Sequence, residues 1–160
     1  MTLRIVLVAL SVLVMSSAPR AQDPPPNDPY AAARHGFSEV SDWITKAAAA
    51  VPPEKYSYRP APSVRTFGEM IAHIADGNTF FCGRATQGRK VQWSDATEKG
   101  KHDKTALAAK LKQSVDACNA AYANNKSNIG DLMSNVAHDN LHYGNIITYM
   151  RMLGLTPPSS

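Results

Sequence analysis

Four stretches of this chain carry apolar residues at intervals of three and four, and none alternates apolar and polar residues for long enough to form a strand. The stretches cover residues 30–50, 66–87 and 105–124, and a last one begins near 129 or 135 and ends near 153. Each can bury one face and expose the other. The pattern predicts an all-α class, and the simplest architecture is a four-helix bundle.

Local residues support these boundaries. Thr66 and Glu69 fit a capping box at the start of the second predicted helix. Pro52–Pro53 should end the first helix, and Gly154 is suited to follow the last one. The only candidate strand, residues 55–59, is expected to be an extended connection.

The connection between the second and third helices is unusually long. It covers the 16 residues 88–103, whereas neighbouring antiparallel helices usually need about two to eight. Sixteen extended residues reach roughly 50 Å, which exceeds the roughly 30 Å length of a 20-residue helix. The connection can therefore cross the whole bundle and let these two helices run parallel. A surface loop on an antiparallel pair is the alternative.

The first residues predict export rather than fold. Arg4 precedes an apolar run at Ile5–Met15, and small residues follow, as in a secretory signal peptide. The run is too short to span a bilayer, which needs roughly 20 residues. We expect cleavage after Ala21, so that residues 1–21 are removed; an uncleaved anchor is the alternative. Residues 22–29 then form a Pro-rich spacer before a domain at residues 30–160.

The predicted export sets the expected compartment and partners. Removing residues 1–21 takes away Arg4 and Arg20 and lowers the formal net charge from +4 to +2. No cluster of Lys and Arg with interleaved aromatic residues remains, so we expect no nucleic-acid partner. The mature protein should be periplasmic or secreted, without stable membrane association. Association into a homodimer is left open.

Two histidines of the fourth predicted helix, His138 and His142, are four residues apart. Side chains at this spacing lie on one helical face, about 6 Å apart at Cβ, and can direct one nitrogen each at a single metal ion. Such pairs are also common without a metal. Here both lie at the edge of the apolar stripe, and His73 has the equivalent position on the second helix. Three histidines can hold a metal and leave coordination positions open, as in catalytic zinc sites.

Asp139 lies inside the apolar stripe of the same helix. It could support a ligand histidine or form a hydrogen bond to another helix, and the sequence leaves both open. The segment HDNLH at residues 138–142 differs from the zincin motif HExxH, because Asp is one methylene shorter than the general base and no third ligand follows downstream. His35 and His102 are expected in solvent.

Two stretches, RTFGEMIAHIAD at residues 65–76 and AHDNLHYGNIITYMRMLGLTPPSS at residues 137–160, resemble the DinB/YfiT-like family. The resemblance covers residues 30–159. It implies a four-helix bundle of up-down-down-up topology, with the long crossover joining two parallel helices. It also implies one divalent metal ion, held by one histidine of helix two and the HxxxH pair of helix four. In this sequence these are His73, His138 and His142.

The two cysteines test the parallel arrangement. Cys82 lies about 24 Å along the second helix and Cys118 about 20 Å along the third, at 1.5 Å per residue. Parallel helices would place them side by side, and we predict that Cys82 and Cys118 form a disulfide, which would persist outside the cytosol. Antiparallel helices would hold them too far apart. Two buried free thiols are the alternative.

The predicted function is that of an exported metal-binding protein. We expect a metal-dependent hydrolase or group transferase that acts on a small molecule through a metal-bound water, with Zn²⁺ or Ni²⁺ as the ion. Some members of the family resemble transferases or isomerases that use low-molecular-weight thiols, which are scarce outside the cytosol. The weak candidates for proton handling are Asp139, Asn145 and Glu69. Residues expected to line the cleft are Met70, Gly77, Ile146 and Tyr149.

Two other functions remain open. A binding module would hold a metal or a metal–ligand complex without turnover. A structural bundle would use the metal only for stability, but structural zinc sites normally have four protein ligands and the sequence offers three.

Overall fold

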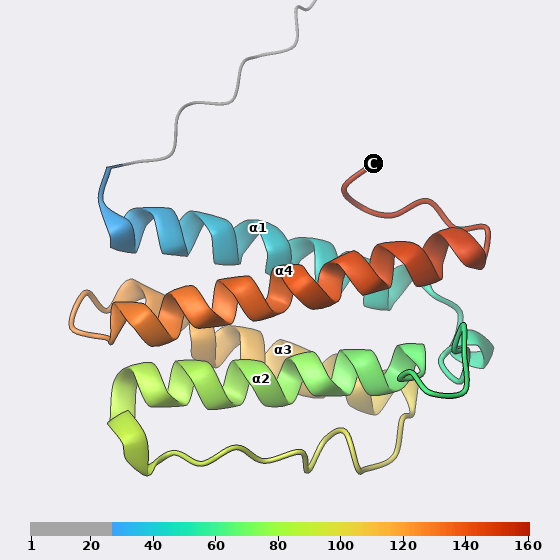
Figure 1. Ribbon diagram of the computed structural model, residues 1–160, viewed down its shortest axis with the longest axis horizontal. Coiled ribbons are helices and arrows are strands. Elements are labelled where there is room, and N and C mark those ends of the chain that lie inside the picture. Colours follow the sequence, from blue (N-terminus) through green and yellow to red (C-terminus); the bar gives the residue numbers. More distant parts are fainter. Residues whose placement is uncertain (1–26) are drawn as a thin grey trace, which may run out of the picture.

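The structure is a computed structural model that describes residues 27–160. It contains the helices α1 (Pro29–Ala50), α2 (Phe67–Gln87), α3 (Lys104–Ala123) and α4 (Ile129–Met152) (Figure 1). Two short 3₁₀ turns follow the first two helices, η1 (Pro53–Lys55) and η2 (Gly88–Lys90). Residues 27–160 contain no strand, which confirms the all-α class. The predicted signal peptide and the spacer up to residue 26 lie outside the described residues.

Polar side chains fix the start of each helix. Each begins after a residue whose side-chain oxygen accepts a backbone N–H of the first turn, namely Asp28, Thr66, Asp103 and Asn128. At α2 the cap is reciprocal, because Glu69 Oε2 accepts the backbone N–H of Thr66 at 2.6 Å. After α4, Gly154 has φ +73°, a conformation that glycine adopts without steric cost.

The helices run up, down, down and up, as predicted. In Figure 1, α1 and α4 run in one direction and α2 and α3 in the other. α2 packs against α3 and α4, while α1 packs against α4 and α3. Residues 88–103 return along the outside of the bundle, from the end of α2 to the start of α3. The long crossover is therefore what allows α2 and α3 to be parallel neighbours.

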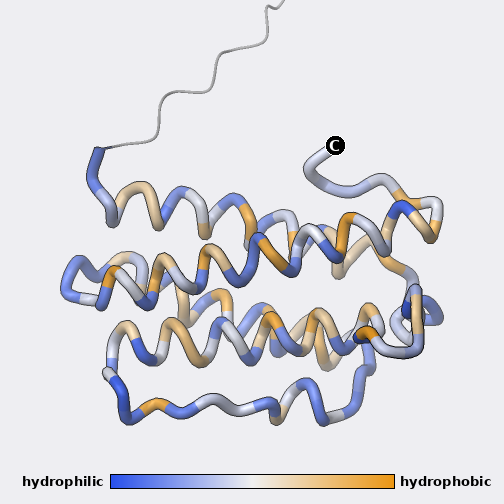
Figure 2. The backbone as a smooth tube through the Cα atoms, viewed as in Figure 1, coloured by the Kyte–Doolittle hydropathy of each residue, from blue (hydrophilic) through white to orange (hydrophobic). Residues whose placement is uncertain are grey.

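The apolar stripes meet in a core that runs through the bundle. Figure 2 shows hydrophobic positions recurring along the helices, whereas residues 88–103 are mostly hydrophilic. In one half of the core, the rings of Phe37 and Tyr122 stack with centroids 4.5 Å apart. In the other half, Tyr56 meets the edge of Phe67, and its hydroxyl donates to the carbonyl of Ala48 at 2.6 Å. None of the described helices is long and apolar enough to cross a membrane.

The segment between α1 and α2 differs from the prediction. We expected residues 55–59 to be extended throughout, but Lys55 completes η1 and the chain turns at Tyr56. The turn lets Tyr56 reach back into the core, where it is 3% exposed. A buried aromatic side chain therefore decides the path of this connection.

A disulfide joins Cys82 of α2 to Cys118 of α3, with their Cα atoms 5.2 Å apart. Buried polar side chains beside the disulfide connect α4 to the same two helices. Asn135 of α4 donates through Nδ2 to Oδ1 of Asn78 at 2.7 Å and accepts from the hydroxyl of Tyr122 at 2.9 Å. These bonds satisfy polar groups that would otherwise be costly to bury. Together they hold α2, α3 and α4 in one register.

We predict that the disulfide stabilises the bundle mainly by restricting the unfolded chain. Replacing Cys82 and Cys118 together by Ala should lower the free energy of unfolding by about 3–4 kcal/mol, the value for a closed loop of this length in the chain-entropy model. Urea denaturation of both proteins measures the difference. Thiol titration of the unfolded, unreduced wild-type protein should find no free thiol; two free thiols per chain would contradict the prediction.

Candidate metal centre

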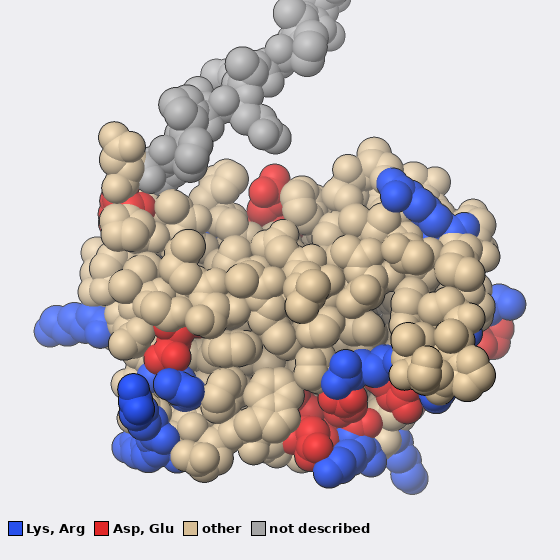
Figure 3. All heavy atoms as spheres, in the orientation of Figure 1, with Lys and Arg blue, Asp and Glu red and all other residues tan. Residues whose placement is uncertain are grey.

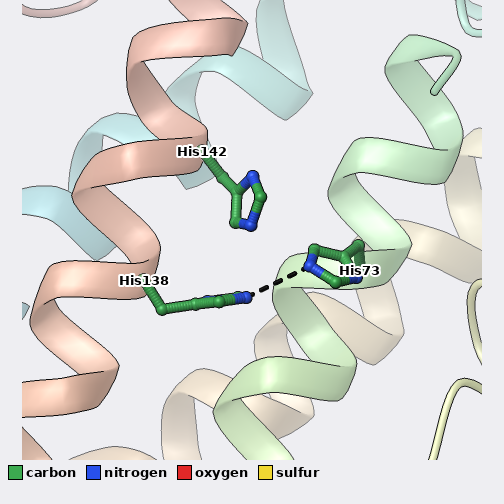
Figure 4. Close-up of side chains that lie close together, drawn as sticks. All are labelled: His73, His138 and His142. Atoms are coloured by element: carbon green, nitrogen blue, oxygen red, sulfur yellow. Dashed lines mark hydrogen bonds between the residues drawn. The ribbon is translucent and has the colours of Figure 1, made fainter. Parts of the chain in front are cut away.

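Three imidazoles from two helices meet on the side of the bundle where α2 packs against α4 (Figure 4). His73 comes from α2, and His138 and His142 come from adjacent turns of α4. Each offers one ring nitrogen, and these three nitrogens lie within 4.8 Å of one another. Nε2 of His73 and Nε2 of His138 are 3.2 Å apart. The structure therefore brings together the three histidines that the sequence singled out.

Gly77 makes this meeting sterically possible. It lies one turn after His73 on α2, and a Cβ built on it would overlap the imidazole ring of His138. The ring of His138 occupies the volume that any larger residue at position 77 would fill. Gly77 therefore leaves room beside His73, as expected, and the imidazole of His138 fills that room.

Carboxylates lie against the outer nitrogens of two of the three rings. Oε2 of Glu98 is 2.8 Å from Nδ1 of His73, and Oδ1 of Asp139 is 3.1 Å from Nδ1 of His138. Nδ1 of His142 is buried without a hydrogen-bond partner. Of the two roles left open for Asp139, the structure shows the contact with a neighbouring histidine and no hydrogen bond to another helix.

Burial controls the protonation of these groups. It raises the pKa of Asp139 from 3.8 to about 6, an effect that the neighbouring His138 partly offsets. Burial also lowers the pKa of His142 from 6.5 to about 4, helped by the nearby imidazoles and the guanidinium of Arg65. The pKa of His73 is lowered too, first by burial, although its contact with Glu98 acts in the opposite direction. At neutral pH, His73 and His142 are therefore uncharged and Asp139 is mostly ionised.

Glu98 is the residue of the site that the sequence analysis missed. It lies in the crossover, and its carboxylate contacts His73 while also forming an ion pair with Arg65, at 2.6 Å from Nε to Oε1. The sequence did show that Glu98 lies in a long connection, which had to pass close to α2. Nothing in the residue pattern indicated which position of the loop would reach the histidines.

Two hollows of about 470 and 480 Å³ flank the pair formed by Arg65 and Glu98. The first is bounded by His142 and also by Met70, Asn145 and Tyr149. The second is bounded by His73, Trp93 and His102 among others. Figure 3 shows charged side chains of both signs gathered along the lower edge of the visible face and few on the surface above them. The site therefore opens to solvent on both sides of an ion pair.

Some residues lie elsewhere than the sequence predicted. Ile146, expected in the cleft, is fully buried in the core, because its side chain continues the apolar stripe of α4. His102, expected in solvent, is half-buried, and its Nε2–H donates to the carbonyl of Glu98 at 2.7 Å. Glu69 serves the cap of α2 and lies 3.4 Å from Arg59. His35 is exposed, as predicted.

The sequence model of the DinB superfamily matches residues 37–136. This chain belongs to the DinB superfamily. The matched segment contains His73 and ends just before His138 and His142, so the last two histidines of the cluster follow from the structure and not from the match. No curated protein matches the chain. DinB proteins are typically metal-binding, and in this member a histidine triad could bind a metal ion.

The donor set fits a small divalent ion. Two nitrogens that each lie about 2.1 Å from a tetrahedral zinc ion are about 3.4 Å apart, which is close to the separation of the facing His73 and His138 nitrogens. The nitrogen that His142 offers lies within 4.8 Å of the other two. Among residues 27–160, this cluster of potential ligands contains three histidines and no carboxylate. An ion held here would keep positions free for other ligands.

We predict that Gly77→Ala strains the site while a matched change elsewhere does not. The new Cβ would force the His138 ring to move, and overpacking of this kind costs roughly 1–3 kcal/mol. Gly144→Ala is the control, because on α4 the added Cβ meets nothing within 4 Å and alanine favours a helix by roughly 1 kcal/mol. Both variants gain the helix preference of alanine, so urea denaturation of the metal-free proteins should show Gly77→Ala to be less stable than Gly144→Ala by roughly 1–3 kcal/mol. Equal stabilities would contradict this explanation of Gly77.

Proposed function

We propose that this DinB-superfamily protein binds one divalent ion, Zn²⁺ or Ni²⁺, through His73, His138 and His142. We further propose that the ion serves hydrolysis of a small molecule or transfer of a group to it. Imidazole ligands suit both metals, and the donor set does not distinguish them. The open coordination positions and the adjoining hollow beside His142 support a reactive rather than a purely structural ion.

The observation that carries the metal site is the orientation of two facing nitrogens. A carboxylate accepts hydrogen bonds, so the contacts with Glu98 and Asp139 place a proton on Nδ1 of His73 and of His138. In the neutral rings, each Nε2 then presents a lone pair. The two Nε2 atoms are 3.2 Å apart, and in these tautomers both are acceptors with no proton to share. A cation bound between the imidazoles removes the repulsion.

A metal ion suits that position better than a proton on His73. Burial lowers the pKa of His73, so this ring does not take up a proton readily at neutral pH, and burial lowers the pKa of His142, the third ring, to about 4. Glu98 and Asp139 bring two negative charges to the outer side of the rings. Neutral nitrogen donors backed by carboxylates are the usual surroundings of a metal-binding histidine, and they raise its strength as a ligand.

Different residues would hold the ion and bind the substrate. A divalent ion supplies Lewis acidity and lowers the pKa of a water that it binds toward about 7. His73, His138 and His142 hold the ion, and the hollow beside His142 receives the small molecule. Arg65 and Asn145 offer polar N–H groups to that hollow, and Met70 offers an apolar surface. Nη1 of Arg65 is not used by the pair with Glu98.

A non-catalytic binding module is the second candidate, and one observation favours it. Each acidic side chain beside the two hollows already has a partner: Glu69 serves the helix cap, Glu98 contacts His73 and Arg65, and Asp95 lies 2.9 Å from Lys99. Among the described residues around the hollows, no carboxylate is left free to act as a general base. Any turnover would depend on chemistry supplied by the ion.

We also propose that the protein works outside the cytosol, after removal of residues 1–21. The buried disulfide between Cys82 and Cys118 supports this, because disulfides persist in oxidising compartments and are rare in the cytosol. N-terminal sequencing of protein from the native host would test it. A mature chain that begins near Gln22 is expected, and an intact Met1 in the cytosolic fraction would reject the proposal.

We predict stoichiometric metal binding that depends on His142. Wild-type protein loaded with Zn²⁺ and freed of excess metal should retain one ion per chain by elemental analysis. His142→Ala should lose most of this occupancy because it removes one of three ligands. His35→Ala is the control, since His35 is exposed on α1 and outside the cluster. Equal zinc content in the two variants would reject the assignment.

We predict that acid releases the ion at an unusually low pH. Ligand histidines must be neutral, so protons compete with the metal. Because burial lowers the pKa of His73 and His142, these rings stay neutral as the pH falls through 6.5, and release is expected between that value and about 4. Zinc retention measured by dialysis at a series of pH values tests this. Complete release already above pH 6.5 would contradict it.

The reaction itself is tested with the metal-loaded protein against small esters, amides and thiol-transfer substrates. Turnover should require the ion and should disappear in His142→Ala. Activity that persists unchanged in the metal-free variant would rule out the proposed chemistry. Metal binding without turnover of any substrate class would favour the binding module.

A further inference from the structure

The crossover is pinned to α2 next to the histidine cluster. Asp76, three residues after His73, accepts the backbone N–H of Glu98 at 2.9 Å and that of Thr97 at 3.1 and 3.2 Å to its two oxygens. Asp76 is 7% exposed, so these bonds are sheltered from competing water. One buried carboxylate on α2 therefore fixes the loop backbone at the residue that contacts His73.

Glu98 is held from three directions. Its backbone N–H donates to Asp76, its backbone carbonyl accepts from Nε2 of His102 at 2.7 Å, and its carboxylate pairs with Arg65. Its Oε2 atom also meets Nδ1 of His73 at 2.8 Å. A residue of a long loop thereby acquires the fixed geometry that is more usual for a residue of a helix.

We propose that Asp76 and Glu98 are positioning residues that keep His73 in the tautomer with its proton on Nδ1. This inference rests on the proposed metal site and extends it to the crossover. With the proton on Nδ1, Nε2 carries the lone pair and points at His138, as a metal ligand must. Asp76 acts at a distance, because it touches the loop and the loop carries the carboxylate.

Glu98 is not itself an additional ligand. Its oxygen meets the ring nitrogen of His73 that points away from His138, and the cluster of potential ligands among residues 27–160 contains no carboxylate. A carboxylate on the outer nitrogen of a ligand histidine orients the ring and strengthens its donation to the metal. Loss of such a partner typically costs about 10–100-fold in metal affinity.

The first test uses metal-free protein and reads the tautomer directly. Nitrogen-15 chemical shifts of the His73 ring, measured at pH 8, distinguish a proton on Nδ1 from one on Nε2. Wild-type protein should show the Nδ1 form, and Glu98→Ala and Asp76→Ala should show a mixture. Glu98→Gln keeps one acceptor oxygen for two donors, Arg65 and His73, so it should show more of the Nδ1 form than Glu98→Ala and less than wild type. Asp95→Ala is the control, since Asp95 lies in the same loop and pairs only with Lys99.

The second test measures zinc affinity of the same proteins by competition with a chelator. Glu98→Ala and Asp76→Ala should bind about 10–100-fold more weakly than wild type. Glu98→Gln should lie between them and wild type, and Asp95→Ala should match wild type. Circular dichroism checks that each variant is folded, and Asp76→Asn replaces Asp76→Ala if the latter is not.

The two tests separate this inference from the proposed function. An unchanged His73 tautomer in folded Glu98→Ala would overturn the inference, and an unchanged tautomer in folded Asp76→Ala would remove Asp76 from it. If wild-type protein binds no zinc while the tautomers shift as expected, the metal site fails and the positioning of His73 by the loop stands.

Discussion

The close approach of α2 and α4 at Gly77 is the constraint on which the candidate site depends. The ring of His138 lies over this glycine, where a Cβ would overlap it. The ring is thereby brought to 3.2 Å from His73, while His142 follows one turn later on the same helix. A larger residue at position 77 would separate the helices or turn the ring away, and the three histidines would not converge. The absence of a side chain is thus as important to the site as the imidazoles.

The two carboxylates beside the histidine cluster would be balanced by a cation bound there. Asp139 is buried beside His138 and has one oxygen without a partner, and Glu98 lies beside His73. A buried carboxylate without a counter-charge is costly, which is why burial raises the pKa of Asp139 to about 6. A cation held between the imidazoles would supply a counter-charge to both carboxylates and reduce the cost of burying them. The same carboxylates would offset part of its charge and so moderate its effect on a bound water.

Much of the fold could be predicted from local patterns, but only part of the site could. Apolar spacing and the Thr66–Glu69 capping box placed α2 closely, and the length of residues 88–103 indicated parallel neighbours. The histidine cluster was predictable because it lies on regular helices, where spacing determines direction. Ile146 was wrongly expected in the cleft, because the position of a residue around the helix axis, near the edge of the apolar stripe, does not decide between cleft and core. Glu98 was missed because no periodicity relates a loop residue to a helix that lies beside it.

The topology and the chemistry of the site are linked through the crossover. Parallel neighbours require a connection that returns along the whole bundle. Here it runs beside α2 (Figure 1), and its residue Glu98 contacts His73. An up-and-down bundle with short connections would have no chain at that place, and His73 would face solvent on its outer side. The crossover instead supplies Glu98, which Asp76 holds against the ring. The feature that distinguishes this topology from a simple bundle is therefore also the source of the carboxylate that orients one of the three candidate ligands.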